Sequence, residues 1–178
     1  MLKRPESNEY AAYYSSYVNR VPDGNIINLL ENQLNKWIYS LKDLTEEQGR
    51  FRYGLDKWTI KEVIGHIADT ERIMGYRMLC IARGETIPLP GYDDISYVQN
   101  AEFNRLSLQE LLDNLMIVRQ STISLLKILP SDSWGRQGNA NGAGVTVRGI
   151  AYIIAGHELH HCQILQDQYL SSADFPAE

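Results

Sequence analysis

Apolar residues recur every three or four positions along four long segments of this 178-residue chain. That spacing is typical of amphipathic helices that bury one face. The four segments cover residues 24–43, 59–83, 107–129 and 146–170. No segment shows the sustained alternation of polar and apolar residues that half-buried strands need. The sequence therefore predicts an all-α fold, a four-helix bundle, in a single domain over residues 1–178.

Local signals set the ends of these helices. Thr59 and Ser107 are each followed three positions later by a glutamate, which is the capping-box pattern of a helix start. Asp23 is a candidate N-cap for the helix over 24–43, and Thr146 begins the last helix. Residues 131–145 are rich in glycine and asparagine, so we expect a loop there.

Two short extra helices are expected outside the bundle. Tyrosines at helical spacing predict one helix over residues 6–18. Prolines interrupt the connection over residues 84–106, where a short helix begins after Asp93 or Asp94. The two ends of the chain, residues 1–5 and 171–178, are predicted to be frayed.

Composition excludes several classes of function. A net charge of −5 without a basic stripe argues against nucleic acid as the main partner. No apolar run is long enough for a membrane span, and no apolar signal segment follows the N-terminus. Only two cysteines are present, in different helical segments, so we expect no disulfide and a cytoplasmic protein. A small molecule is the expected substrate.

Three of the four histidines lie close together near the C-terminus. On a helix, His157 and His161 are one turn apart on a face that also carries isoleucines, so both rings should point inward. Such a pair can hold one divalent cation. His66 lies in another apolar helix and would be the third ligand. Three protein ligands are what a catalytic metal site with an open position needs. His160 points off this face and is the expected non-ligand.

Other interpretations of these histidines stay open. The three rings could be packed, hydrogen-bonded core residues without a metal. The segment from His157 to His161 also fits the HExxH pattern of zinc peptidases, but no histidine follows as a third ligand. A di-iron bundle needs two Glu-x-x-His pairs, and only Glu158 with His161 forms one. Cys162 is either a packed thiol or a reactive one, and packing is favoured.

Polar residues accompany His66 along its helix. Thr70 and Arg77 project close to it, and Glu62 and Asp69 lie further round the same flank, which forms a polar seam beside an apolar face. Such a seam suits a site, although it is also a common way for a helix to meet solvent. Trp58 and Trp134 stand just outside helix ends, where either could wall a pocket or pack beneath a loop.

With these residues, the chain resembles the DinB/YfiT-like superfamily of bundle proteins over nearly its whole length. The blocks that carry the resemblance are KWTIKEVIGHIADTE at 57–71, PLPGYD at 88–93 and VRGIAYIIAGHELHH at 147–161. The resemblance implies an up-down-down-up order of helices, produced by the long connection at 84–106. It also implies one divalent transition metal ion, zinc or nickel, held by His66, His157 and His161 with water completing the shell.

The resemblance also implies a range of activities. Relatives with known chemistry include S-transferases that use bacillithiol or mycothiol and isomerases that use such thiols, and others are described as hydrolases. We therefore expect a metal-dependent enzyme, foremost a low-molecular-weight-thiol S-transferase acting on small electrophiles in stress or detoxification. A metal-dependent hydrolase and a non-catalytic metal- or ligand-binding bundle are the alternatives. Asp69 and Glu158 are candidates to accept the second N–H of the ligand rings. The family's habit and the tyrosine-rich N-terminal surface suggest a homodimer.

Overall fold

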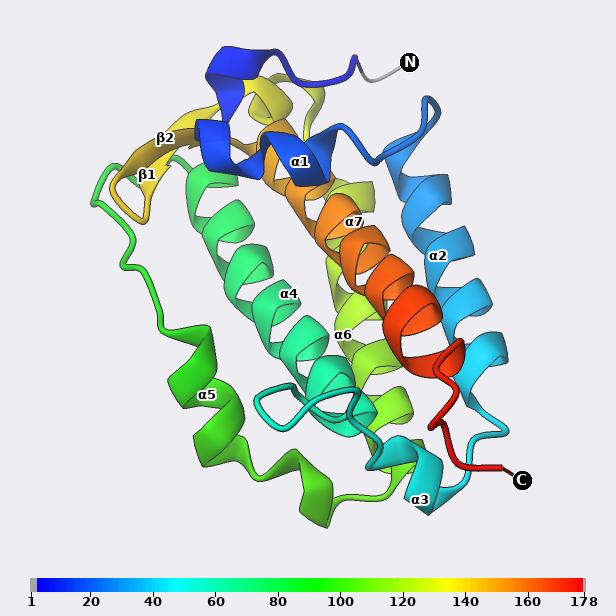
Figure 1. Ribbon diagram of the computed structural model, residues 1–178. Helices are drawn as coiled ribbons and strands as arrows, with labels where there is room; N and C mark the ends of the chain where they lie inside the picture. Colours follow the sequence, from blue (N-terminus) through cyan, green and yellow to red (C-terminus); the bar gives the residue numbers. More distant parts are fainter. Residues whose placement is uncertain (1–2, 178) are drawn as a thin grey trace.

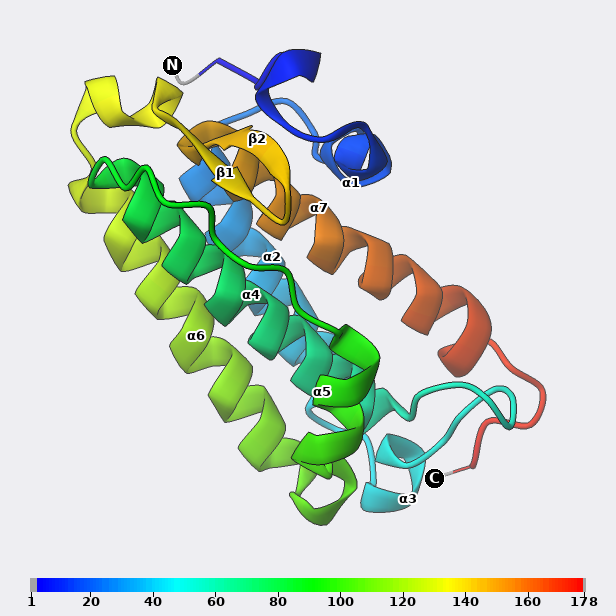
Figure 2. The ribbon, with the colours of Figure 1, turned by 90° about the vertical axis from the view of Figure 1, so that its left-hand side faces the viewer.

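Four long helices form a bundle in the computed structural model, which describes residues 3–177 (Figure 1). The bundle helices are α2 (Ile26–Leu41), α4 (Ile60–Ala82), α6 (Leu108–Ile128) and α7 (Val147–Ile164). Helices α2 and α7 run in one direction and α4 and α6 in the other, which confirms the predicted up-down-down-up order (Figures 1 and 2). Each of α4 and α2 packs against both α6 and α7, so α4 and α2 lie diagonally across the bundle.

The connection between α4 and α6 sets this order. It leaves the end of α4, runs back along the bundle and carries α5 (Asp94–Ala101) and a 3-10 turn (Phe103–Arg105) (Figure 2). Because the chain returns to the end where α4 began, α6 starts beside the start of α4 and runs parallel to it. The 84–106 connection therefore produces the up-down-down-up order, as expected, and it contains the predicted short helix.

The helix starts follow the local signals with one exception. The Thr59 and Ser107 side chains accept from the backbone N–H groups of Glu62 and Glu110, and both capping boxes are complete. Asp93 caps α5. The predicted cap Asp23 is wrong, because Asn25, two residues later, accepts from the N–H of Ile27 at 2.9 Å and starts α2.

The loop expected over residues 131–145 is wrong for most of that segment. Residues 137–146 form an antiparallel hairpin of β1 (Gln137–Ala140) and β2 (Ala143–Thr146), preceded by a 3-10 turn (Ser131–Gly135). Its two central residues, Asn141 and Gly142, have φ of 54° and 76°. Positive φ at both positions is what a two-residue hairpin turn requires, and Asn-Gly is its commonest sequence. The expectation of no strand was wrong because these strands are too short to show alternation.

The N-terminal segment crosses the outer face of α7 (Figure 1). In place of one helix over 6–18, it forms two 3-10 turns (Ser7–Glu9 and Ala12–Tyr14) and the short α1 (Ser15–Val18). It packs so closely on α7 that a Cβ at Gly156 would lie 2.1 Å from the carbonyl oxygen of Tyr17. Glycine at this position lets α1 reach the helix that carries two of the histidines.

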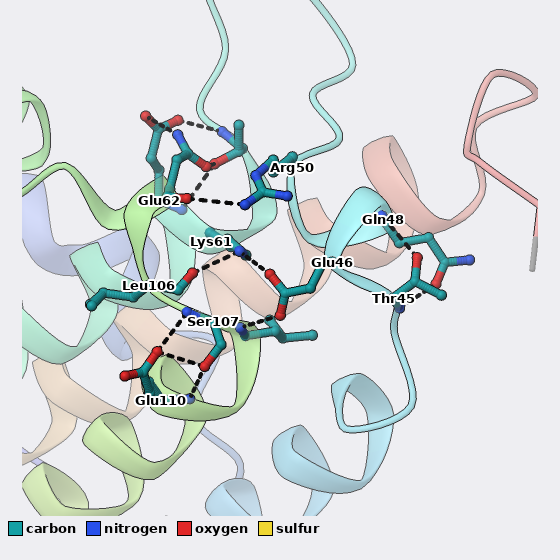
Figure 3. A network of polar contacts seen from close by, with 12 residues as sticks. Thr45, Glu46, Gln48, Arg50, Lys61, Glu62, Leu106, Ser107 and Glu110 are labelled. Carbon is teal, nitrogen blue, oxygen red and sulfur yellow. Dashed lines mark hydrogen bonds and ion pairs between the residues drawn. The ribbon is translucent and has the colours of Figure 1, made fainter.

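A polar network closes the opposite end of the bundle (Figure 3). The fully buried Lys61 of α4 pairs with Glu46 of α3 (Glu46–Gly49) and donates to the carbonyl of Leu106 at 2.7 Å. Glu46 also accepts from the N–H of Leu108 at 2.9 Å, so this pair joins α3 to the starts of α4 and α6.

The described parts of the two ends, which the sequence predicts to be frayed, are hydrogen-bonded to the short helices α1 and α3. Arg4 donates to the carbonyl of Val18 at 2.9 Å, and Gln48 donates to that of Pro176 at 3.0 Å. After α7 the chain continues through a π-helical turn (Leu165–Leu170). Within residues 3–177, no helix combines the length and apolar character that crossing a membrane requires.

Candidate metal centre

The three predicted histidines meet at one buried point between α4 and α7. His66 comes from α4, and His157 and His161 come from successive turns of α7. The Nε2 atom of His157 lies 3.1 Å from the Nε2 atoms of both His66 and His161. The three side chains are only 5%, 8% and 9% exposed, respectively. The fold therefore brings the three predicted residues together. One possible ligand atom from each of them lies within 4.8 Å of the other two.

The donor set fits a divalent transition metal. Ligand nitrogens about 2.0–2.1 Å from an ion lie about 3.3 Å apart in a tetrahedron and about 2.9 Å apart at right angles. The observed 3.1 Å separations lie between these two values. Hydrogen bonds alone cannot satisfy the cluster, because the one Nε2 of His157 can pair in its ring plane with only one of its two neighbours.

The buried environment keeps all three rings neutral. Burial is the main cause that lowers the pKa of His66 to about 4 and that of His161 to about 3. Burial, together with the neighbouring histidines, holds the pKa of His157 well below its usual range. Near pH 7 the rings are therefore unprotonated, which is the form that coordinates a metal ion.

Aromatic rings cover two of the histidines. The ring of Trp58, at the start of α4, lies 4.7 Å from that of His66, centre to centre. The ring of Tyr17, on α1, meets His157 edge-on at 5.4 Å and also packs against His160 at 5.2 Å. Trp58 is thus a wall of the site, as the sequence allowed. Tyr17 was missed, because its place depends on how the N-terminal segment crosses α7.

Trp134 and His160 lie outside the cluster. Trp134 is buried in the hydrophobic core near the hairpin and walls no part of this site. His160 is half-buried, and its ring is not among the three that converge.

The two carboxylates expected to orient the histidine rings do not do so. Asp69 pairs with Arg72 at 3.0 Å, and Glu158 pairs with the buried Arg119 of α6 at 2.5 Å. Arg119 also makes a bidentate contact with Glu71 of α4. Its Nε donates to Oε1 at 2.8 Å, and its Nη2 donates to Oε2 at 2.8 Å. Sequence reasoning missed this network, although an arginine on the apolar stripe of a core helix was a signal for it.

The network around Arg119 ties all four bundle helices together. Burial is the main cause that raises the pKa of Glu158 to about 7, with Glu71 adding to the effect and Arg119 opposing it. Burial alone would lower the pKa of Arg119, but the two carboxylates raise it above its usual range. Arg119 also donates to the carbonyl of Leu30 in α2 at 3.1 Å, so one guanidinium contacts all three neighbouring helices.

A cleft of about 560 Å³ reaches the site at His161. Its walls are largely aromatic and aliphatic, and they include Trp58, Tyr53, Ile95, Val98, Ile164 and Tyr169. Charged side chains complete the lining, namely Arg52, Lys57, Asp56, Glu62 and Asp94. Asp94 is close enough to His66 to oppose, in part, the lowering of its pKa by burial. The site can therefore receive a small organic molecule beside the histidine nitrogens.

The profile of the DinB superfamily matches residues 29–165, which span α2 to the end of α7. The chain belongs to the DinB superfamily. A curated relative from Oceanobacillus iheyensis, named "putative metal-dependent hydrolase", is 24% identical over 151 residues, which cover 78% of this chain and 86% of the relative.

Two solved structures share the DinB bundle. YfiT from Bacillus subtilis, described as a probable metal-dependent hydrolase with an unusual four-helix bundle topology, superimposes with a TM-score of 0.73 at 18% identity, over 83% of this chain and 90% of YfiT. A mycothiol-dependent maleylpyruvate isomerase superimposes with a TM-score of 0.67 at 15% identity, over 89% of this chain but 66% of the isomerase. At these identities the likeness shows the fold.

The cysteine next to the site is a packed residue in this DinB protein. Cys162 faces a separate cavity between α2 and α7, which Trp37 and Leu159 also line. Burial raises the pKa of the Cys162 thiol far above its usual range. Because the thiolate is the reactive form, this environment makes the side chain a poor nucleophile, as the sequence favoured.

Proposed function

We propose that this DinB protein is a metal-dependent enzyme that joins a low-molecular-weight thiol to a small organic electrophile. The observation that carries the proposal is the convergence of three neutral imidazole nitrogens, from His66, His157 and His161, beside a cleft. A divalent ion held by these residues would act as a Lewis acid and lower the pKa of a thiol or a water molecule.

The surrounding side chains suit such a reaction. The three ligands add no negative charge, so they do not weaken the acidity of the ion. Tyr17 and Trp58 pack against the rings of His157 and His66, respectively, and would shield these two rings from water. The apolar walls of the cleft would hold the organic body of an electrophile, and Arg52 and Lys57 would attract an anionic thiol cosubstrate. The structural likeness to a mycothiol-dependent isomerase supports a thiol as the partner.

A metal-dependent hydrolase is the second candidate, and Asp94 favours it. This carboxylate lines the same cleft and acts electrostatically on His66, so it could take a proton from an attacking water. The names of the relatives point the same way. A non-catalytic carrier is less consistent with the site, because its open side should be closed by side chains whereas the cleft reaches His161.

Metal content and thiol transfer test the proposal together. Purified protein should contain about one transition metal ion per chain, the His157→Ala variant should lose it, and the matched His160→Ala variant should retain it. With zinc, nickel or manganese supplied, the wild type should consume bacillithiol or mycothiol in the presence of an aromatic chloride electrophile. Equal and negligible metal in all three proteins would refute the metal site.

The variant Asp94→Asn separates the two reactions. Under the thiol-transfer proposal it should change the rate of thiol consumption less than about threefold, because the thiol loses its proton without this carboxylate. Under hydrolysis it should lower the rate of ester cleavage by about 10²-fold or more. Ester cleavage without any thiol consumption would replace our proposal with the second candidate.

A further inference from the structure

Three cationic side chains are buried within residues 3–177, and they differ in their partners. Lys61 pairs with Glu46, and Arg119 pairs with Glu71 and Glu158. Arg77, only 3% exposed, has no carboxylate within ion-pair distance in this described part of the chain. A buried charge without a counter-ion is costly, and proteins keep such charges where a ligand or partner neutralises them.

The contacts of Arg77 position its guanidinium without neutralising it. One terminal nitrogen donates to the carbonyl of Pro90 at 2.6 Å, and the other lies 3.7 Å from the sulfur of Met74. The guanidinium carbon lies 5.9 Å from the centre of the Tyr92 ring. The Tyr92 hydroxyl is in turn held by Thr70 at 2.7 Å. The cation is therefore fixed against an aromatic wall, with capacity left for an anion.

A cavity of about 280 Å³ lies between α4, the 88–92 segment and α5, and Arg77 is one of its lining residues. The guanidinium contacts two other lining residues of this cavity, Pro90 and Tyr92. Its lining holds two arginines, three tyrosines, aliphatic side chains and no carboxylate, as the full set shows: Arg72, Ile73, Tyr76, Arg77, Leu89, Pro90, Gly91, Tyr92 and Tyr97. Arg72 already pairs with Asp69 and bonds to Asn114, so Arg77 is the cation whose charge is free to act. The cavity thus combines positive charge with flat apolar walls.

We propose that this cavity binds a small planar organic anion, with its carboxylate on Arg77 and its ring or unsaturated body between the tyrosines. A planar guanidinium binds a carboxylate through two parallel hydrogen bonds, which gives both charge pairing and orientation. Tyr92 and Tyr97, whose ring centres are 5.3 Å apart, provide the aromatic surface.

This site is distinct from the histidine cleft and goes beyond the proposed function. The two cavities share no lining residue, although α5 borders both. Arg77 is eleven residues after His66 on the same helix, which is about 16 Å along its axis at 1.5 Å per residue. A benzoate-sized anion on Arg77 therefore does not reach the histidines, so binding can be measured without metal or turnover.

Calorimetric titration of the full-length protein with benzoate, benzamide and inorganic phosphate tests the proposal. Benzoate should bind saturably with one site per chain. Benzamide, which has the same ring without the charge, and phosphate, which has the charge without the ring, should each bind at least about tenfold more weakly. Equal affinity for benzoate and benzamide, or for benzoate and phosphate, would overturn the proposed ligand class.

Variants locate the site. Arg77→Gln should weaken benzoate at least about tenfold, whereas the matched Arg105→Gln, an exposed arginine paired with Glu102, should leave its affinity unchanged. Because Arg77→Gln also removes the contact to Pro90, Tyr97→Ala provides a second variant at a ring that is 48% exposed. Tyr97→Ala should keep the wild-type circular dichroism spectrum and weaken benzoate several-fold.

The metal centre needs its own control, because carboxylates also coordinate metal ions. Benzoate should bind the His157→Ala variant with the wild-type affinity. If that variant loses the binding, or if both Arg77→Gln and Tyr97→Ala retain it, the anion binds elsewhere and the proposal is wrong.

Discussion

Gly156→Ala should destabilise the protein, although alanine is normally the better residue within a helix. The added Cβ would lie 2.1 Å from the carbonyl oxygen and 2.4 Å from the carbonyl carbon of Tyr17. Both are backbone atoms, so the N-terminal segment must move away from α7. Overpacking of this kind costs typically about 1–3 kcal/mol, and the gain in helix propensity returns about 1 kcal/mol. Because the clash is with backbone atoms, we expect a cost in the upper part of that range, and so a net loss of about 1–2 kcal/mol in the free energy of unfolding.

Gly75→Ala is the matched control, because it makes the same change within α4 where there is space. The nearest atom to its added Cβ is the hydroxyl oxygen of Thr122 at 3.9 Å, an ordinary contact. This variant should gain about 0.5–1 kcal/mol. Urea unfolding of both variants measures the difference in unfolding free energy between them, expected to be about 1.5–3 kcal/mol. A Gly156→Ala protein as stable as Gly75→Ala would refute the close docking of the N-terminal segment on α7.

Three further predictions concern stability. Arg119→Met leaves two buried carboxylates, Glu71 and Glu158, without a cation. Urea unfolding should therefore show a loss of about 3–5 kcal/mol in the free energy of unfolding. Burial alone would raise the pKa of Glu9, but hydrogen bonds, first from Arg148, lower it below its usual range. That stabilisation is complete above the unfolded pKa of about 4.3 and is lost as pH falls through the lower folded pKa, so the advantage of wild type over Glu9→Gln in thermal melts should shrink below about pH 4. Asn141 has φ of 54°, so Asn141→Ala should cost about 1 kcal/mol in unfolding free energy and Asn141→Gly should cost little.

The parts of the fold that could be predicted depend on neighbours in the sequence. Thr59 and Ser107 start their helices because each side chain bonds to a backbone group three residues away. The hairpin depends on an equally local signal, Asn141-Gly142, but this glycine- and asparagine-rich run predicts a loop when the flanking strands are too short to show alternation. A two-residue turn signal can thus specify a hairpin that periodicity does not show.

The site could be predicted only as far as its residues lie on recognisable helix faces. His157 and His161 share a face at a fixed spacing, and His66 is the only histidine of the sequence outside the C-terminal cluster. The partner of Arg119 and the place of Tyr17 depend instead on how helices distant in sequence rotate and cross. The contact of Tyr17 with His157, for example, requires the close approach at Gly156, which no single-sequence pattern encodes.

The HExxH pattern shows how one distant residue decides the chemistry of a motif. In zinc peptidases the glutamate is the general base, so its carboxylate must face the metal and its water. Here Glu158 is fully buried and ion-paired with Arg119, which also holds Glu71. A carboxylate fixed in that way cannot take a proton from a molecule at the histidine nitrogens unless the guanidinium pair is broken. The two histidines of the pattern therefore keep their place at the candidate metal site, while its glutamate serves the packing of α7 against α4 and α6.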